Sequence, residues 1–400
     1  MSNLETLTLP ILRELVGGSA AALRLRVRLQ PTGGEGDKVF PPTYMDGPYA
    51  TEDRRINGQD VKCVLLDSVQ SQANRMEKAL LEAWRAGDIK IPVIEVVFPP
   101  EVFDGQPFTV TSLDAPHRVA DAILRDSTLN GVPFNKTPAR KALADATSEN
   151  ATALYRACPT ALVFGVWDSS GPRGGLGAKF ARALVSEVVA FGAVPGVKPG
   201  GRLDPLGIRA DVKVVKEAGD AWRLAEGGDG KEAKGAVAPS EINHSNIPPA
   251  LADKNKKKNP GGFTFDYAEQ IGVLSFAALR RLRFPVNGQA TPAQTLAART
   301  ALAALAVAAL AGQSRDGWFF RSRCDLYATG ELEFEAVGTD RRFAVNADTA
   351  FVLLNAASDA ATAAGIGWEQ AAVRLIPGSN LQMLVKRSRE NTIRKGSEEE

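Results

Sequence analysis

Hydrophobic and polar residues alternate with a period of two near the start of the chain. Leucine or valine occupies every odd position of residues 23–29, and arginine occupies the even positions Arg24, Arg26 and Arg28. This alternation predicts a β-strand with one face buried in a core. Its arginine face either lies on an exposed sheet surface or faces an anion such as a phosphate group.

Between residues 61 and 84, the spacing of apolar residues changes from a period of two, typical of a strand, to one of about 3.6, typical of a helix. The largely apolar run Val61–Leu66 predicts a buried strand, and Asp67 and Ser68 then supply a helix N-cap. The predicted core-facing positions of the helix are Val69, Ala73, Met76, Leu80 and Trp84.

The opposite face of this predicted helix is polar. It presents Ser71, Asn74, Arg75 and Lys78, whose donor groups begin at the positive end of the helix dipole. Donors clustered there suit a phosphate or a nucleic-acid backbone. The alternative is a solvated polar face, which the helix pattern taken alone favours.

A first glycine-rich segment, residues 30–44, directly follows the arginine strand. It holds three glycines and Lys38, and Arg54 and Arg55 come after it. Glycines let backbone amides approach a ligand closely, and lysine adds positive charge. By itself such a segment is only a weak indication of a binding site.

A second glycine-rich segment follows the apolar run Ala161–Trp167, which predicts a buried strand, and precedes a predicted helix that continues to Phe191. Its candidate phosphate contacts are Arg173, Gly174, Gly175, Lys179 and Arg182. The glycine spacing fits neither a P-loop nor a dinucleotide-binding motif. The segment is therefore either a phosphate cradle outside the NTPase classes or a plain strand-to-helix turn.

Glycine, proline and charged residues dominate residues 202–262. Such a segment buries too little apolar area to pack alone, so it predicts a long, flexible projecting arm. A basic cluster that includes Lys256 and Lys257 either grips nucleic acid or is solvated, and the sequence leaves both open.

The remaining patterns mix helices and strands, which predicts an α+β fold with insertions. The predicted helices are 4–17, 116–129, 137–155, a stretch ending at Arg283, an alanine-rich helix from Thr291 and 347–364. The predicted strands are 89–98, 263–267, 318–326, 331–337 and 373–376. Glutamates in 331–337 predict cross-strand ion pairs for Arg321 and Arg323.

Composition adds few constraints on function. The net charge is only +2, so a nucleic-acid site must be a local concentration of basic groups. Three widely spaced cysteines predict a reducing cytoplasm, and His117 and His244 lie in turn-rich surroundings that make them poor catalytic candidates. The longest apolar run, 301–311, falls short of the roughly 20 residues that cross a membrane.

Several of these motifs together resemble a known family. The ordered combination of Gln30–Gly34, Lys38–Pro42, Asp53–Arg55 and Leu65–Glu77 resembles the RAMP-type backbone subunit of type I-G (formerly I-U) CRISPR effector complexes. The segment 164–182 fits the same family, and the similarity extends over about residues 20–385.

The resemblance implies a modified RNA-recognition-motif (ferredoxin-like) palm. The palm would be a single core domain over 20–390, interrupted by a helical insertion at 99–158 and a thumb-like arm at 202–262, with a charged tail at 391–400. Gln70, Ser71, Asn74 and Arg75 would contact guide phosphates.

The implied role is that of a non-catalytic subunit without a cofactor or a membrane. Its partners would be the CRISPR RNA, the target DNA strand paired to it, copies of the same chain in a helical assembly, and other effector subunits.

Two other functions remain open. A metal-dependent ribonuclease of the RAMP class would use Asp67 or Asp168, which both follow predicted strands, although helix capping explains both aspartates more simply. A small nucleotide-phosphate-binding protein would use residues 168–182, although the glycine spacing argues against it.

Overall fold

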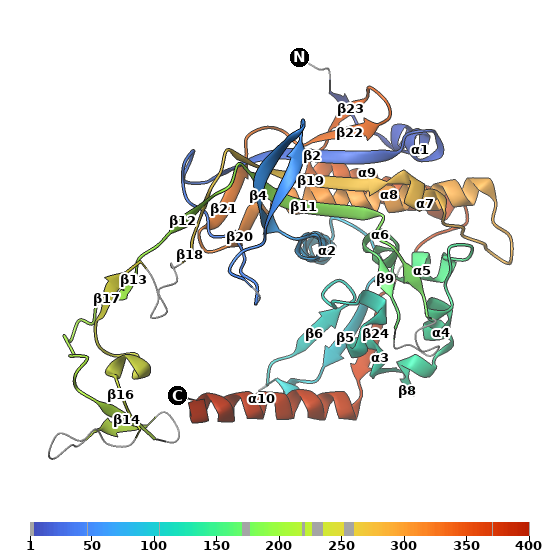
Figure 1. The fold of residues 1–400 in the computed structure, drawn as a ribbon. Coiled ribbons are helices and arrows are strands. Elements are labelled where there is room, and N and C mark those ends of the chain that lie inside the picture. Colours follow the sequence, from blue (N-terminus) through green and yellow to red (C-terminus); the bar gives the residue numbers. More distant parts are fainter. Residues whose placement is uncertain are drawn as a thin grey trace. The chain divides into compact units, whose positions relative to one another are not determined.

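A computed structural model describes residues 4–45, 47–103, 105–169, 177–217, 221–225, 235–251, 260–369 and 371–399, with side chains up to residue 392. The chain forms two compact units (Figure 1). The first comprises Met1–Val194 and Phe265–Leu381, and the second comprises Pro195–Thr264 and Gln382–Glu400.

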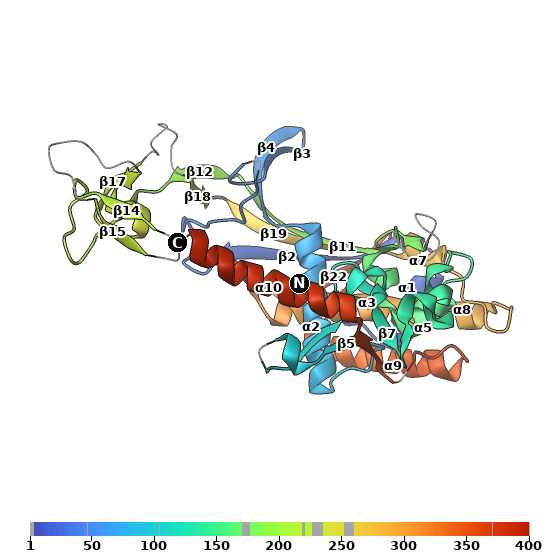
Figure 2. The same ribbon diagram turned by 90° about the horizontal axis from the view of Figure 1, so that it is seen from below.

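The first unit is built on a ten-stranded sheet in which neighbours are antiparallel except for one parallel pair, β1 with β23. Its main path runs through β1 (Glu5–Thr6), β23 (Arg342–Ala344), β22 (Glu333–Val337), β2 (Ala22–Pro31), β19 (Tyr267–Ser275), β11 (Leu184–Phe191), β4 (Gln59–Asp67) and β3 (Thr51–Ile56). Off this path, β21 (Cys324–Ala328) pairs with β2 and with β20 (Trp318–Arg321). Figure 2 shows the β3–β4 hairpin at the outer edge of this sheet.

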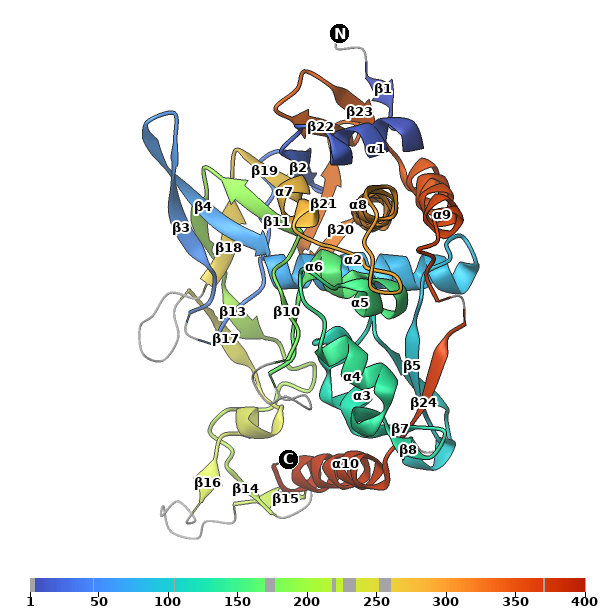
Figure 3. The ribbon, with the colours of Figure 1, turned by 90° about the vertical axis from the view of Figure 1, so that its right-hand side faces the viewer.

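Helices cover one face of this sheet. They are α1 (Leu9–Gly17), α2 (Val69–Ala86), α7 (Phe276–Arg280), α8 (Pro292–Arg315) and α9 (Ala347–Ala363). Figure 3 shows α8 end-on, with α2 crossing it and α9 alongside. The apolar residues of β2 are buried on this face, as their alternation predicts.

The alanine-rich helix α8 is the centre of the core. Every residue from Thr300 to Ser314 is buried, and small side chains allow close packing on the sheet. At Gly272 in β19, a Cβ atom would lie 2.8 Å from Leu310 Cδ2, so only glycine fits without a shift. Among the described residues α8 is long and apolar enough to cross a membrane, yet most of its apolar stretch is buried inside the unit.

A second sheet of the same unit has five strands in the order β6 (Phe108–Thr111), β5 (Ile94–Phe98), β24 (Val373–Pro377), β7 (Ser127–Leu129) and β8 (Val132–Pro133). Short helices accompany it: η1 (Pro100–Val102), η2 (Arg118–Ala120), α3 (Ala122–Arg125), η3 (Phe134–Lys136), α4 (Pro138–Ala144), α5 (Thr152–Ala157) and α6 (Thr160–Phe164). Residues 99–158 therefore contain strands as well as helices. The helical stretches predicted over 116–129 and 137–155 are each two short helices, and the first range ends in β7.

The second unit contains small β-ladders. They pair β12 (Val194–Val197) with β18 (Pro260–Thr264), β13 (Gly200–Arg202) with β17 (Ile247–Ala250), and β14 (Val214–Lys216) with β15 (Trp222–Leu224) and β16 (Ala236–Val237). The short helix η5 (Pro239–Ile242) joins them, and α10 (Ser379–Glu399) extends through the predicted charged tail.

The α+β class is confirmed, but three element assignments are wrong. The predicted strand Ala161–Trp167 is α6 followed by β9 (Val166–Trp167), which pairs with β10 (Lys179–Phe180). The predicted helix ending at Phe191 is the strand β11. In the stretch predicted to be helical up to Arg283, the first part is the strand β19 and only α7 is helical. Short apolar runs do not distinguish a buried helix from a strand that has partners on both sides.

The cross-strand pairing predicted for Arg321 and Arg323 is also wrong. Strand β22 lies beside β2 and β23 rather than beside β20. Glu335 therefore pairs with Arg24, and Glu333 pairs with Arg342. Arg321 instead donates to the carbonyl of Pro41, and the Arg323 guanidinium lies over the Phe40 ring.

Candidate nucleic-acid interface

Helix α2 begins directly at the end of β4, as the change of period predicts. Ser68 is its N-cap, and its Oγ accepts a hydrogen bond from the Ser71 amide at 3.3 Å. Asp67 does not cap the helix. Its carboxylate is buried, and Oδ2 accepts hydrogen bonds from Gln72 Nε2 at 2.6 Å and Arg75 Nε at 3.0 Å.

The Arg75 side chain ties α2 to β20. Its Nη1 and Nη2 atoms donate to the carbonyls of Phe319 and Phe320 at 3.1 and 3.3 Å, and the guanidinium lies over the Phe320 ring. With Nε bound to Asp67, every nitrogen of the guanidinium has a partner within the protein. Arg75 therefore holds α2 against β20.

A buried network of polar side chains fixes the orientation of α2 against the sheet. Gln72 Oε1 accepts from Ser186 Oγ at 3.0 Å and from Gln270 Nε2 at 2.9 Å. Gln270 Oε1 in turn accepts from Trp318 Nε1 at 2.7 Å. A network whose members are buried and bonded holds its elements in one arrangement, because each lost bond leaves an unpaired polar group.

The exposed edge of the N-terminal half of α2 consists of Gln70, Asn74 and Lys78, which lie one turn apart. Ser71 is half-buried beside it. Of the four residues assigned to guide phosphates, Gln70 and Asn74 thus offer free amide groups at the surface, whereas Arg75 is turned toward β20.

A groove runs along the N-terminal half of α2, within the first unit, with a volume of about 540 Å³. It is lined by Gln70, Ala73 and Asn74 of α2, by Pro116, His117 and Arg118, by residues 164–167, and by residues 179–182. Two predicted contacts from the second glycine-rich segment, Lys179 and Arg182, are exposed here. The fold thus brings Gln70 and Asn74 together with Lys179 and Arg182, which lie more than 100 residues further along the chain.

A buried ion pair lies beneath this groove. Arg118 Nε and Nη2 donate to Glu77 Oε1 and Oε2 at 2.6 and 2.8 Å, and Arg118 Nη1 donates to the Gly165 carbonyl at 3.0 Å. Burial raises the pKa of Glu77 to about 7, although Arg118 acts in the opposite direction. The pair connects α2, the start of η2 and the C-terminal end of α6, which all line the groove.

The wall opposite α2 is the short β9–β10 ladder. Trp167 pairs with Lys179 across it, and Lys179 Nζ lies 5.2 Å from the centroid of the indole. The next residue, Asp168, is buried and accepts a hydrogen bond from Arg140 Nη2 at 2.6 Å. Asp168 therefore anchors this wall, in the same way that Asp67 anchors α2.

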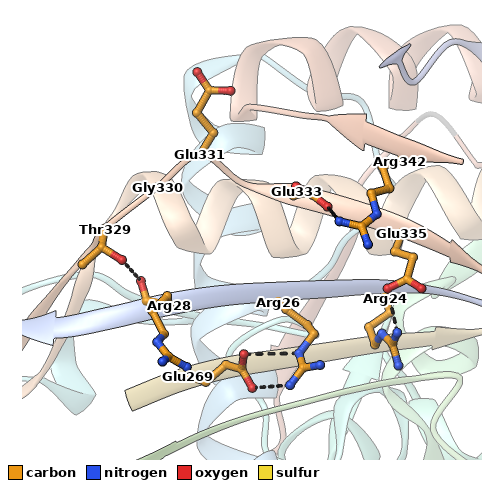
Figure 4. Close-up of a pocket in the computed structure, with 10 residues that line it drawn as sticks. All are labelled: Arg24, Arg26, Arg28, Glu269, Thr329, Gly330, Glu331, Glu333, Glu335 and Arg342. Atoms are coloured by element: carbon orange, nitrogen blue, oxygen red, sulfur yellow. Dashed lines mark hydrogen bonds and ion pairs between the residues drawn. The ribbon is translucent and has the colours of Figure 1, made fainter. Parts of the chain in front are cut away.

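The arginine face of β2 lies on the sheet surface that the helices leave uncovered, and it is neutralised (Figure 4). Arg24 Nη2 bonds Glu335 at 2.6 Å, Arg26 makes two bonds to Glu269, and Arg28 lies over the Tyr267 ring. Hydrogen bonding to Arg24 lowers the pKa of Glu335. The pocket there, about 590 Å³, is lined by four arginines and four glutamates, so it has no net positive charge.

The other predicted contacts lie away from the groove. Arg54 pairs with Glu52 and Glu187, and Arg55 pairs with Asp60. The backbone amide of Lys38 donates to Asp37. Arg173, Gly174, Gly175, Lys256 and Lys257 lie outside the described residues.

Among the groove residues that sequence reasoning did not predict as contacts are His117, Arg118 and Trp167. His117 and Arg118 follow no recognisable motif, and Trp167 belongs to an apolar run that predicts burial. One feature of the sequence could have indicated that Trp167 is exposed. The polar residues that follow it directly place the end of the apolar run 161–167 near the surface. Within the described residues, no group of three His, Cys, Asp or Glu side chains is placed to hold a metal ion.

Residues 23–195 match a protein family described as CRISPR-associated protein GSU0053. The match supports a CRISPR-associated protein. It covers β2 from Leu23 onward, the strand-to-helix junction at Asp67, all of α2, and every residue that lines the groove. A comparison with curated proteins found no match. The CRISPR association that the sequence motifs imply is thereby confirmed.

Proposed function

We propose that the protein is a non-catalytic, guide-RNA-binding backbone subunit of a type I CRISPR complex. Several copies would assemble side by side along the CRISPR RNA, in contact with other effector subunits, and present the guide to a target DNA strand. The observation that carries this proposal is the groove that Gln70, Asn74, Lys179 and Arg182 line together.

The chemistry of the groove suits a nucleic-acid backbone. Lys179 and Arg182 supply positive charge, and Gln70 and Asn74 supply donors beside the N-terminal half of α2, where the helix dipole favours anions. Contacts of this kind hold phosphates without reading sequence. That property is required of a subunit that must accept any guide.

The order of elements supports an RNA-recognition-motif-like palm. The chain passes through β2, α2, β11, β19, α8 and β22, which is a β-α-β-β-α-β succession. In the sheet these strands lie in the order β22, β2, β19, β11, with the β3–β4 hairpin added beside β11. The second unit is inserted largely between β11 and β19, where it would serve as the thumb-like arm.

The environment of both aspartates supports the absence of catalysis. Asp67 and Asp168 are each 2% exposed, and each carboxylate is paired with an arginine. An aspartate that binds a catalytic metal must present its oxygens to an open site. We expect the protein to act in the cytoplasm as a binder.

The first test is the nucleic acid that co-purifies with the protein. We expect RNA of several tens of nucleotides and no mononucleotide. A purified protein that carries no RNA and fails to bind added guide RNA would refute the proposal.

The second test places the RNA in the groove. Binding of guide RNA is measured over a salt series for Lys179→Ala, Arg182→Ala and a control, Arg85→Ala, which removes an exposed arginine at the far end of α2. Each groove variant should weaken binding and reduce the salt slope by about 0.7, the value for one phosphate contact to a single strand. The control should change neither quantity. Equal effects of all three variants would place the RNA elsewhere.

A further inference from the structure

Trp167 is unusually exposed for a tryptophan next to a core. The residue is 60% exposed, although the adjacent Val166 is buried. Tryptophan is rarely left at a surface without a partner, because its ring carries a large apolar area. Lys179 Nζ lies over one face of the indole, 5.2 Å from the ring centroid. His117 and Arg182 line the same groove, together with apolar residues such as Phe164 and Phe180, so the ring is an exposed aromatic surface with cationic groups nearby.

The backbone around Trp167 is held on both sides. Before it, Gly165 has a φ of +84°, a conformation that L side chains rarely adopt, and its carbonyl accepts from Arg118. After it, the Asp168 amide donates to the Ala178 carbonyl at 2.9 Å, and the Asp168 side chain is bonded to Arg140. The ring is therefore presented by a fixed backbone, which lowers the entropy lost when a ligand binds.

The combination of a flat aromatic surface and two adjacent cations matches one nucleotide unit. A base stacks on an aromatic ring, and the flanking phosphates pair with lysine and arginine. Stacking accepts any base because every base has a π-face, so it adds affinity without sequence preference. A base is available for stacking only when it is unpaired, which selects single-stranded nucleic acid.

We propose that Trp167 is a stacking platform for one unpaired base of a single-stranded nucleic acid, with Lys179 and Arg182 holding the adjacent phosphates. The proposal rests on the proposed function, in which the guide RNA occupies this groove.

The test separates bases from phosphates. Two oligonucleotides of equal length are compared, an unstructured RNA and an abasic ribose-phosphate chain with the same charge. The full-length protein should bind the RNA at least about fivefold more tightly than the abasic chain, as one stacked base predicts. In Trp167→Ala this ratio should fall toward one, and in Trp167→Phe, which keeps an aromatic ring, most of it should remain.

Trp222→Ala is the matched control, because Trp222 is also exposed but belongs to the second unit. It should keep the wild-type ratio, and thermal melting should show that all three variants are folded. Unchanged preference for RNA over the abasic chain in Trp167→Ala would overturn this inference and leave the proposed function standing. Loss of self-assembly in Trp167→Ala without any change in that preference would likewise overturn it, in favour of a protein contact. Failure of the wild type to bind either chain would instead refute the proposed function.

Discussion

The guanidinium of Arg118 and the carboxylate of Glu77 form a two-bond ion pair beneath the groove, with N–O distances of 2.6 and 2.8 Å. Both side chains are more than nine-tenths buried. A buried pair of this kind gains little net stability, because desolvation of two charges offsets their attraction. Its effect is to fix the relative positions of α2 and the Gly165 turn, between which the groove lies.

Loss of one member of this pair should be costly. In Arg118→Met, Glu77 keeps a buried carboxylate without its partner, and we expect a loss of about 3–5 kcal/mol in the free energy of unfolding. The double variant Arg118→Met/Glu77→Leu should recover much of this loss, because no charge is left buried. Urea unfolding measures both. The surface pair Arg85–Glu82 is the control, and its removal should cost less than about 1 kcal/mol.

The raised pKa of Glu77 predicts a pH dependence of stability. Because the native state holds the proton up to about pH 7 and the unfolded chain releases it near 4.5, the contribution of Glu77 is present below pH 4.5 and lost as the pH rises through 7. The stability of the wild type relative to Glu77→Gln should therefore fall between pH 4.5 and 7 by up to about 3 kcal/mol, at 1.36 kcal/mol per pKa unit. Parallel curves for the two proteins would contradict the shift.

Arg75 should affect folding more than binding. Arg75→Ala removes the bonds to Asp67, Phe319 and Phe320, and we expect a destabilisation of about 1.5–3 kcal/mol, the range for hydrogen bonds to charged groups. RNA affinity per folded molecule should change less than in Lys179→Ala. A larger loss of affinity in Arg75→Ala, without loss of stability, would restore Arg75 as a direct guide contact.

The arginine face of β2 should contribute little to RNA binding. Arg26→Ala removes one cation whose partner is Glu269, and the surrounding pocket is balanced in charge. We expect RNA affinity and its salt slope to stay within experimental error of the wild type. A salt slope reduced as far as in Arg182→Ala would show that the guide crosses this face instead.

Much of the local structure follows from neighbouring residues. The alternation at 23–29 predicts β2, and the change of period at Asp67–Ser68 predicts the junction of β4 and α2. The helices near 292–315 and 347–363 follow from long apolar patterns with clear caps at Thr291 and Asn346. These patterns depend only on residues that are close together in the sequence. They can therefore be recognised without knowledge of the rest of the fold.

The site could be predicted only in part. Gln70 and Asn74 on α2, and Lys179 and Arg182 after the second glycine-rich segment, were all candidates, but nothing in the chain indicated that they share one groove. Conversely, the sequence alone makes three other arginines look as suitable for phosphate contacts as the groove residues. They are Arg24, Arg26 and Arg75. Their acidic and carbonyl partners, which come from residues up to 311 positions away, are invisible in the sequence.

The sequence by itself thus determined which segments are amphipathic, where α2 begins, and that the chain is CRISPR-associated. Only the tertiary structure decided that the segment ending at Phe191 is a central strand, because a strand is selected by partners on both sides. It also decided which cations remain available, since Glu335 and Glu269 neutralise the β2 arginines whereas Lys179 and Arg182 face α2. The sequence shows which residues are cationic. Whether a cationic side chain is free to bind an anion depends on its pairing with residues that are distant in the sequence.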